Sequence, residues 1–395
     1  MVGLAFVLGA AVAFACADFA HALPSPLLQH DARFPRPGGQ SGIAYDRQWV
    51  NPKPTPADTK ADWWWMNAQA NSGVNGKAPA NVQVVFYQGY VFPVPTDLPK
   101  YYVSVEGSFP NGTTFGYTLF ATDSVVTTQD TTSTGNWAGV GQFRSKPGKT
   151  YQVTFANDFV NGAIQLDVDT PPHFSCNTTT SPFFDSVAPS SLTAEEEVLF
   201  KRIGWAVSAP NAKAKVSLTI EGAPLVFIGT GYHDQNFVDS STYFANSISE
   251  WLFGSAEVGP YAFSYLATRA HNSQWTFTTG FLSKNGVILQ NQCSTVATSS
   301  IPGSQPGPNR SKVTPWGVKV SPGSGVNVPK GYVVDYTLSD GKTYRFNLTE
   351  TAEILDIPIY HRSIGPVSGG KVGEPAQNGV VLFEWLNPGV NVYDP

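Results

Sequence analysis

Charged residues are scarce in this chain. Asp, Glu, Lys and Arg make up 13% of its 395 residues, about half of the roughly 25% that is usual for globular proteins. The net charge is −5 and the chain contains no basic run, which argues against nucleic acid as a partner. Motifs of the types CxxC, HExxH and GxSxG are also absent from the sequence. Their absence argues against a redox protein, a zincin and a serine hydrolase with a nucleophile elbow.

Aromatic residues, in contrast, are abundant. The chain contains 10 Trp, 16 Tyr and 25 Phe, and hydrophobic residues make up 42% of it, so we do not expect intrinsic disorder. A length of 395 residues is sufficient for two domains. Few charges and many rings together favour a large β core with an apolar pocket.

Residues 1–22 have the features of a secretory signal peptide. Leu4–Ala15 is an apolar core of suitable length, and Ala20-His21-Ala22 offers a cleavage site of the small-x-small type. Asp18 and His21 end the apolar run well short of the length that spans a bilayer. No other segment of that kind follows in the sequence, so we expect a secreted or lumenal protein without a membrane span.

Four Asn-x-Ser/Thr sequons agree with passage through a secretory pathway, where such sites are glycosylated. They begin at Asn111, Asn177, Asn309 and Asn347. Cys16 would be removed with the signal peptide, which leaves Cys176 and Cys293. In an oxidising compartment we expect a Cys176–Cys293 disulfide, which would stabilise the fold by about 4–5 kcal/mol. The alternative is two separate buried thiols.

The rest of the chain shows an all-β pattern. Residues 23–60 are rich in Pro and lack periodicity, so we expect an irregular N-terminal arm. From residue 61 onward, short β-like runs alternate with turn signals such as Asn-Gly. One helix-like stretch, 191–202, lies near the expected junction of two domains. We predict two antiparallel β domains, a sandwich over 61–200 and a barrel over 201–395, and eight-stranded barrels can hold one small ligand.

The most informative segment is Leu225–Phe237, in which an apolar run leads into two glycines and then into His233, Asp234 and Asn236. Polar groups at the end of a buried strand are costly unless they are hydrogen-bonded. The trio is therefore either a structural network that ties loops together or a catalytic site. Because His233 and Asp234 are adjacent, they point to opposite faces of a strand, and only one of them faces a given cavity.

A second segment, at 62–69, has the sequence DWWWMNAQ. As a strand it would have two faces, one with Trp63, Trp65, Asn67 and Gln69 and the other with Trp64, Met66 and Ala68. The first face combines two indoles with two amides, which suits hydrogen bonding to a carbonyl group inside an aromatic wall. The alternative is that the large side chains fill a core and Asn67 satisfies backbone groups.

Three segments together resemble a known family. The sequences DWWWMNAQ at 62–69, GYHDQN at 231–236, and WLFG at 251–254 with YAFSY at 261–265 are similar in order and spacing to motifs of the hydroxyneurosporene-synthase-like (carotenoid hydratase-like) superfamily, which includes fungal Diels–Alderases. The resemblance implies two lipocalin-like β domains with the ligand held in a pocket between them. Asn67 stands where an acidic residue is frequent in the family, and Phe237 replaces the usual Trp. We therefore expect no mechanism that needs a carboxylate at position 67.

The resemblance also implies a cofactor-independent pericyclase of fungal natural-product biosynthesis. The signal peptide and sequons resemble the branch of tropolone-sesquiterpenoid hetero-Diels–Alderases, which join a tropolone o-quinone methide, formed by dehydration, to a humulene-type terpene. The expected partner is a small polyketide or terpenoid substrate, with no metal and no organic cofactor. Two alternatives stay open: a hydratase or dehydratase of an isoprenoid, and a lipocalin-like carrier of an apolar ligand. Only the enzymes need an acid or a hydrogen-bond donor aimed into the cavity.

The candidate site residues follow from these motifs. Asp234 or His233 would help water leave a hydroxymethyl tropolone, and Arg269 or Lys371 would bind the tropolonate oxygen. The residues expected to bind the substrate are Trp63, Trp65, Asn67, Asn236, Trp251, Tyr265 and Trp275. Taken singly, Trp251, Tyr265, Trp275 and Trp385 are accounted for by core packing, whereas as a set at least one of them is expected to reach the cavity.

Overall fold

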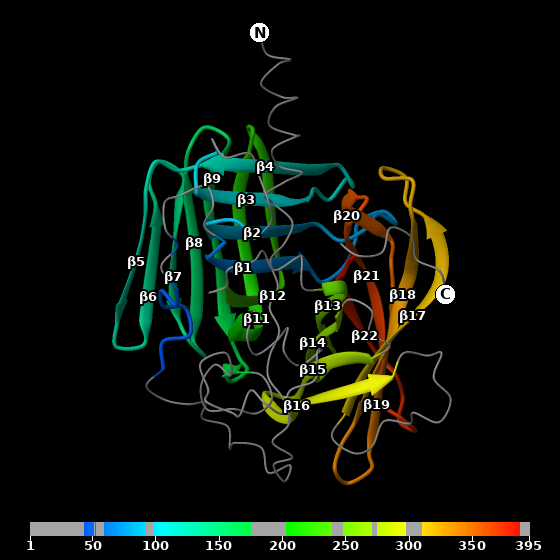
Figure 1. The fold of residues 1–395 in the computed structure, drawn as a ribbon. Coiled ribbons are helices and arrows are strands. Elements are labelled where there is room, and N and C mark those ends of the chain that lie inside the picture. The colour runs from blue at the N-terminus through cyan, green and yellow to red at the C-terminus, as the bar shows by residue number, and fades with distance from the viewer. Residues whose placement is uncertain are drawn as a thin grey trace. The chain divides into compact units, whose positions relative to one another are not determined.

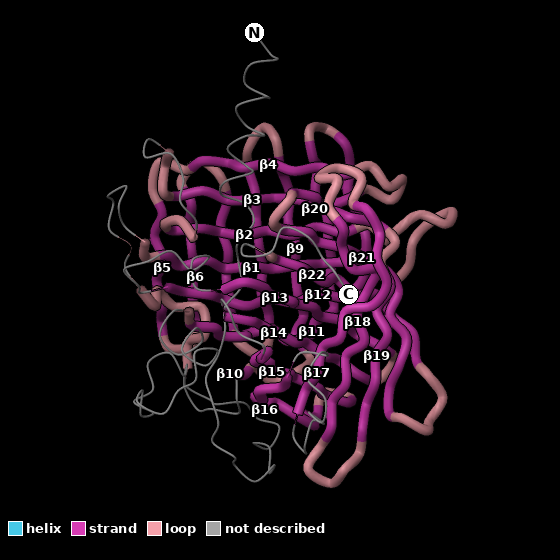
Figure 2. The backbone as a smooth tube through the Cα atoms, turned by 45° about the vertical axis from the view of Figure 1, so that its right-hand side comes forward, coloured by secondary structure: helices cyan, strands magenta, loops and turns pink. Residues whose placement is uncertain are grey.

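The computed structural model describes residues 43–50, 52, 59–91, 98–174, 203–238, 248–270, 275–297 and 310–387. Every regular element within these residues is a β-strand, and none is a helix (Figure 1; Figure 2). The predicted all-β fold is thereby confirmed. In the same residues, no helix is long and apolar enough to cross a membrane. The predicted signal peptide, the helix-like stretch and Cys176 lie outside the described part of the chain, as does the side chain of Cys293.

The strands form two curled antiparallel sheets, consistent with a pair of lipocalin-like half-barrels. The contacts of the chain divide it into two compact units. Among the described residues, the first unit contains 43–172 and 206–238, and the second contains 173–174, 203–205 and 248–387.

The first sheet has the strand order β4-β3-β2-β1-β12-β11-β9-β8-β7-β6-β5, with β10 paired to β11 off this path (Figure 1). Its strands are β1 (Ala61–Ala70), β2 (Asn81–Gln88), β3 (Tyr101–Ser108), β4 (Thr114–Phe120), β5 (Ser124–Gln129), β6 (Thr132–Trp137), β7 (Gly141–Lys146), β8 (Thr150–Ala156), β9 (Val160–Val168), β10 (His173–Phe174), β11 (Gly204–Ile220) and β12 (Ala223–Val238).

The long hairpin β11–β12 shows where the sequence prediction of the domain boundary differs from the structure. Residue 201 was predicted to open the second domain, yet β11 pairs with β9 and β12 pairs with β1, so 206–238 belongs to the first unit. The hairpin turns at Glu221-Gly222, whose φ angles are 45° and 83°, and a two-residue turn with both φ angles positive matches the twist of the flanking strands. Local patterns identify such a hairpin, but not the distant strands with which it pairs.

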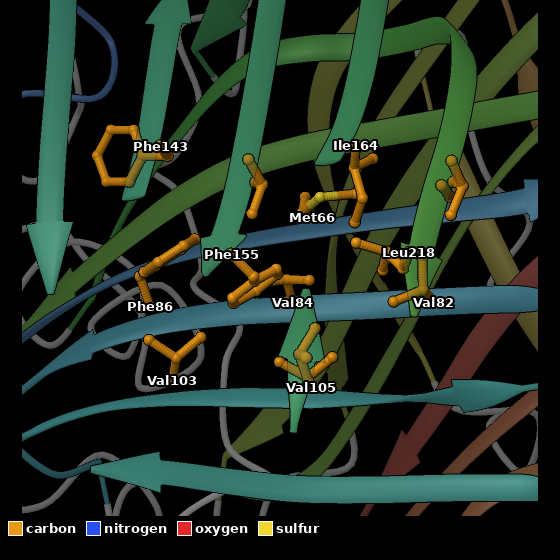
Figure 3. Close-up of a cluster of buried hydrophobic side chains, with 14 of the residues drawn as sticks. Met66, Val82, Val84, Phe86, Val103, Val105, Phe143, Phe155, Ile164 and Leu218 are labelled. Carbon is orange, nitrogen blue, oxygen red and sulfur yellow. The ribbon is translucent and has the colours of Figure 1, made fainter. Parts of the chain in front are cut away.

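One face of β1, β2 and β3 forms much of the hydrophobic core of the first unit (Figure 3). This core includes Trp64, Met66, Val84, Phe86 and Val105, all of them buried. Each such apolar side chain contributes about 1.5–3 kcal/mol to folding. The core therefore fixes which way every residue of β1 points, because neighbouring residues of a strand alternate between its two faces.

The second sheet has the order β16-β15-β14-β13-β22-β21-β19-β18-β17, with β20 paired to β21. Its strands are β13 (Ile248–Val258), β14 (Tyr261–Ala270), β15 (Trp275–Lys284), β16 (Val287–Ala297), β17 (Arg310–Val320), β18 (Asn327–Thr337), β19 (Thr343–Thr349), β20 (Ala352–Ile357), β21 (Tyr360–Lys371) and β22 (Gln377–Leu386). Its core is rich in rings, among them Phe263, Tyr265, Tyr336 and Phe346.

Candidate functional site

The register between β1 and β12 separates the predicted site residues onto two faces. Trp65 lies opposite Asp234, and Met66 lies opposite His233. Directly opposed residues of an antiparallel pair share a face. Asp234 is therefore on the face of Trp65, whereas His233 is on the core face with Met66. The sequence prediction that His233 and Asp234 point to opposite faces is confirmed.

The face that carries Asp234 is buried, but it is not apolar. We call it the polar face, and the registers of β12, β1, β2 and β3 define its members. They are Tyr232, Asp234 and Asn236 on β12, Trp63, Trp65, Asn67 and Gln69 on β1, Asn81, Gln83, Val85 and Tyr87 on β2, and Tyr102, Ser104, Glu106 and Ser108 on β3. All are buried, and all but Val85 carry a polar atom. Such a set is costly unless its polar groups find partners.

Asp234, on β12, accepts hydrogen bonds from two other side chains of the polar face. The hydroxyl of Tyr232 donates to its Oδ2 at 2.9 Å, and the Nδ2 of Asn236 donates to its Oδ1 at 2.7 Å. The ring of Trp65 lies 5.6 Å from that of Tyr232, centroid to centroid. A fixed carboxylate, two amides and two indoles therefore lie on adjoining strands. Trp63, Trp65, Asn67 and Asn236, which were predicted to bind the substrate, share this face with Asp234, and their binding roles stay predictions.

The indole Nε1 of Trp63 and the Oδ1 of Asn236 are polar atoms of this face without a hydrogen-bond partner among the described residues. Both residues are fully buried. The orientation of the Asn236 amide follows from Asp234, because a carboxylate oxygen only accepts and the amide nitrogen must therefore face it. One buried donor and one buried acceptor consequently belong to residues that lie directly opposite each other.

On β2 and β3 the polar face is satisfied internally. The Nδ2 of Asn81 donates to Ser108 Oγ at 2.6 Å, and Gln83 Nε2 donates to Asn81 Oδ1 at 2.8 Å. Ser104 Oγ donates to Glu106 Oε1 at 3.2 Å. This half of the polar face is a hydrogen-bonded network that holds its side chains in place. The unsatisfied atoms gather instead around β1 and β12.

His233 has a different environment from Asp234. Its Nδ1 lies 2.7 Å from the backbone oxygen of Trp65, and its Nε2 lies 2.8 Å from Asp46 Oδ1. A backbone oxygen only accepts, so Nδ1 carries the proton. The imidazole also stacks on the ring of Tyr151 at 3.5 Å. Both His233 and Asp46 have fully buried side chains, so this pair anchors the core side of the sheet.

Asp46 was missed by sequence reasoning, because it lies within the 23–60 segment that was expected to be an irregular arm. Part of that segment, 43–50, is held against the first unit by side chains. Asp46 also accepts a hydrogen bond from Ser145 Oγ, and its backbone oxygen accepts one from Trp64 Nε1 at 3.1 Å. The absence of periodicity in this segment hid its buried carboxylate.

A second carboxylate, Asp62, fastens the same segment. Its Oδ2 accepts hydrogen bonds from the backbone N–H groups of Trp49 and Val50 at 3.2 and 3.0 Å and from Gln48 Nε2 at 2.7 Å. Complete burial raises the pKa of Asp62 well above its ordinary value, although these donors oppose the shift. We call 43–50 the latch segment, since Asp46 and Asp62 join it to β1 and β12.

The remaining predicted site residues belong to the second unit. Arg269 forms an ion pair with Glu250, with 3.4 Å between Nη2 and Oε2. Trp251 and Tyr265 are both buried, but only Tyr265 is part of the core of that unit, because the β13–β14 register puts them on opposite faces. Lys371 is paired with Glu374. The side chain of Trp275 lies outside those that the structure describes, and the substrate roles of all these residues stay predictions.

One cluster in the second unit contains metal-ligating residue types. Glu353, Asp356 and His361 place one ligand atom each within 4.8 Å of one another. Their atoms already have protein partners: His361 Nδ1 lies 3.2 Å from Glu353 Oε1, and the ammonium of Lys319 lies 3.0 Å from Glu353 Oε2. Burial raises the pKa of Glu353, but the hydrogen bonds from His361, Ser321 and Lys319 outweigh burial and lower it overall. The ammonium of Lys319 therefore supplies a positive charge beside these carboxylates.

Two fungal proteins match this chain over most of its length. It is 28% identical over 346 residues to the quinolone epoxide rearrangement protein penF of Penicillium thymicola, which covers 84% of this chain and 86% of that protein. It is 25% identical over 332 residues to the quinolone epoxide rearrangement protein asqO of Emericella nidulans, which covers 82% of this chain and 83% of that protein.

Solved structures share the fold. CghA, solved alone and with Sch210972, superposes with a TM-score of 0.65 at 17% sequence identity, over 91% of this chain and 97% of CghA. A putative AttH from Nitrosomonas europaea superposes with a TM-score of 0.52 at 13% identity, over 92% of this chain and 98% of that chain. These likenesses show the two-sheet fold.

Residues 59–387 match the Diels-Alderase-like family, and the chain therefore belongs to this family. The matched region begins just before β1 and ends just after β22, so it includes both sheets and the whole polar face. The resemblance to fungal Diels–Alderases is confirmed at the level of the family. The tropolone-sesquiterpenoid branch and the hydroxyneurosporene reaction stay predictions.

Proposed function

We propose that this protein is a cofactor-independent pericyclase, or a closely related rearrangement enzyme, that acts on a small natural-product intermediate of fungal secondary metabolism. Membership of the Diels-Alderase-like family and the two quinolone epoxide rearrangement relatives support this reaction class. The observation that carries the proposal is the polar face, on which indoles, amides and the fixed carboxylate of Asp234 are buried together.

A pericyclic reaction needs little covalent help from a protein. Its barrier falls when a flexible substrate is held in one reactive conformation, an effect that supplies up to roughly 7–11 kcal/mol. Hydrogen bonds from fixed indole or amide N–H groups to a substrate carbonyl add to this, since they stabilise charge that develops in the transition state. The rigid sheet, with every member of the polar face buried, suits both tasks.

Asp234 adds a chemical capability that a simple carrier does not need. A buried carboxyl group on this face can protonate a leaving hydroxyl or an opening epoxide, or accept a proton from the substrate. Its burial beside two aromatic residues of β1 and β12 supports an enzyme over a lipocalin-like carrier. The specific reaction that we propose is the joining of a tropolone o-quinone methide, formed by dehydration, to a humulene-type terpene.

The compartment is part of the proposal. We propose that the chain enters a secretory pathway, which residues 1–22 and the four sequons support. Two of the acceptor residues lie within the described part of the chain, and both Asn111 and Asn347 are exposed. Exposure is required of a glycosylated Asn, so the positions of these two residues agree with the proposal.

The direct test is turnover by the purified protein. It is incubated separately with a hydroxymethyl tropolone plus a humulene-type terpene, with a polyene that can form a decalin, and with a quinolone epoxide, and products are measured by mass spectrometry against a no-protein control. Accelerated formation of any one cyclised or rearranged product is expected. If none of the three reactions is accelerated, the proposed class of activity is wrong for these substrates and the carrier hypothesis gains.

Variants of Asp234 connect that activity to the polar face. We expect Asp234→Ala to lower the rate at least tenfold, because it removes the carboxyl group and releases both Tyr232 and Asn236. The matched control is Asp167→Ala, which removes a partly exposed carboxylate of the same unit, paired with Lys215, and is expected to keep the wild-type rate. An Asp234→Ala protein with unchanged rate would remove this residue from the mechanism.

A further inference from the structure

We propose that Trp63 and Asn236 form a recognition pair for a substrate group whose hydrogen-bond acceptor and hydrogen-bond donor are two or three bonds apart. A lactam (O=C–N–H) and an α-hydroxy ketone such as a tropolone (O=C–C–O–H) share this chemistry. The inference rests on the proposed function, because it names the substrate group that the polar face would bind.

Trp63 and Asn236 each carry a buried polar atom that the protein leaves unsatisfied. Trp63 Nε1 is a pure donor, Asn236 Oδ1 is a pure acceptor, and neither has a partner among the described residues although both residues are fully buried. Leaving such a group unpaired in the interior costs about 1–3 kcal/mol. Buried polar atoms are satisfied in most proteins, so a donor and an acceptor left open on directly opposed residues indicate a ligand that bonds to both.

Their spacing suits one compact polar group. Trp63 and Asn236 are directly opposed in the β1–β12 register, which places their Cβ atoms about 4.5–5.5 Å apart. No hydrogen bond joins the indole N–H of Trp63 to Asn236 Oδ1. A ligand whose carbonyl accepts from Trp63 and whose N–H or O–H donates to Asn236 would satisfy both atoms at once.

Asp234 is a positioning residue in this arrangement. Its Oδ1 accepts from Asn236 Nδ2 at 2.7 Å, which orients the amide so that Oδ1 is the atom offered to the ligand. The hydroxyl of Tyr232 holds the other carboxylate oxygen at 2.9 Å. Without Asp234 the amide could rotate and offer a donor in place of an acceptor, which would reverse its preference.

The test uses four probe molecules and the wild-type protein. The probes are 2-quinolone and tropolone, each with a methylated control, 1-methyl-2-quinolone and 2-methoxytropone, that keeps the carbonyl and lacks the donor. Binding is followed through the indole N–H signals in a 15N-labelled sample, with the Trp63 signal assigned by its loss in Trp63→Phe. Trp64 is the internal control, because its Nε1 lies on the core face and already donates to the Asp46 backbone oxygen.

The expected result is a shift of the Trp63 signal, but not of the Trp64 signal, with 2-quinolone, tropolone or both. The methylated form of a bound probe is expected to bind at least fivefold more weakly, and which parent probe binds identifies the source of the shared chemistry. Trp63→Phe is expected to weaken binding of that probe to a similar extent. If neither probe shifts the Trp63 signal, or if the methylated forms bind as tightly as their parents, the recognition pair is refuted.

The outcome is separable from that of the proposed function. Trp63→Phe that turns over its substrate with wild-type KM and kcat would overturn the recognition pair while the enzymatic activity stands. Selective probe binding without turnover of any candidate substrate would support the recognition pair and count against the enzyme. The comparison of parent and methylated probes on the wild-type protein needs no variant, so it holds even if Trp63→Phe folds poorly.

Discussion

The Asp46–His233 pair gives a quantitative prediction about the latch segment. Asp46→Ala removes the acceptor that lies 2.8 Å from His233 Nε2 and also the acceptor of the Ser145 hydroxyl. Breaking a fully buried pair by removal of one partner costs about 3–5 kcal/mol. Since 1.4 kcal/mol is a factor of ten in an equilibrium constant, amides of β1 and β12 should exchange with solvent roughly 100- to 4000-fold faster.

Hydrogen–deuterium exchange of peptides from β1 and β12 measures this effect in the first unit alone. Asp46→Asn is the informative companion variant, because an amide still accepts from Ser145 and its N–H can donate to the Nε2 of a neutral His233. We expect it to cost only about 1 kcal/mol. Asp167→Ala breaks an ion pair whose side chains are 37% and 61% exposed, and such pairs are worth about 0–1 kcal/mol.

The three variants are ranked by their stability. We expect Asp46→Ala to be far less stable than Asp46→Asn, and Asp167→Ala to be close to the wild type. Equal exchange rates for Asp46→Ala and Asp167→Ala would show that the latch segment contributes nothing measurable to the first unit.

Three further predictions concern the second unit and the surface. Arg362→Leu should lower the free energy of unfolding in urea by about 3–5 kcal/mol, because it leaves the buried Glu384, whose Oε1 lies 2.7 Å from Arg362 Nε, without its cation. Adding Glu384→Leu should recover most of this loss. A double variant no more stable than Arg362→Leu would contradict this. Burial lowers the pKa of His173 to about 3, so between pH 6.5 and 3 the folded state binds fewer protons than the unfolded state, and stability falls as the pH falls. Between pH 6.5 and 5, His173→Phe should therefore lose about 2 kcal/mol less unfolding free energy than the wild type. The same dependence of unfolding free energy on pH in both proteins would refute this prediction. Asn347→Gln should lower the apparent mass of the protein secreted from a fungal host by that of one glycan, so that it migrates faster in electrophoresis. Unchanged migration would mean that this exposed site is not glycosylated.

Several features of the site could be predicted from the sequence. The alternation of large and polar residues in 62–69 was sufficient to assign Trp63, Trp65 and Asn67 to one face, and the β1–β12 register confirms it. The same rule separated His233 from Asp234. These predictions succeed because the side-chain direction of a strand depends only on residue parity.

Other features depend on contacts between distant parts of the chain. Asp46 meets His233 across 187 positions of sequence, and no local pattern marks an aspartate in a Pro-rich segment as buried. The domain boundary was misplaced for a similar reason, because β12 pairs not only with its hairpin partner β11 but also with the distant strand β1. Periodicity predicts which residues face a core, but it does not predict which segment completes that core.

The two faces of β1 have different surroundings. Its even-numbered residues, such as Trp64 and Met66, pack in the core, while its odd-numbered residues belong to the polar face. Under the proposed function, a substitution at Trp65 or Asn67 changes what the polar face binds without removing a residue from the hydrophobic core of the first unit. The proposal then implies that one such scaffold can be adapted to new substrates by exchanging every second residue of a single strand.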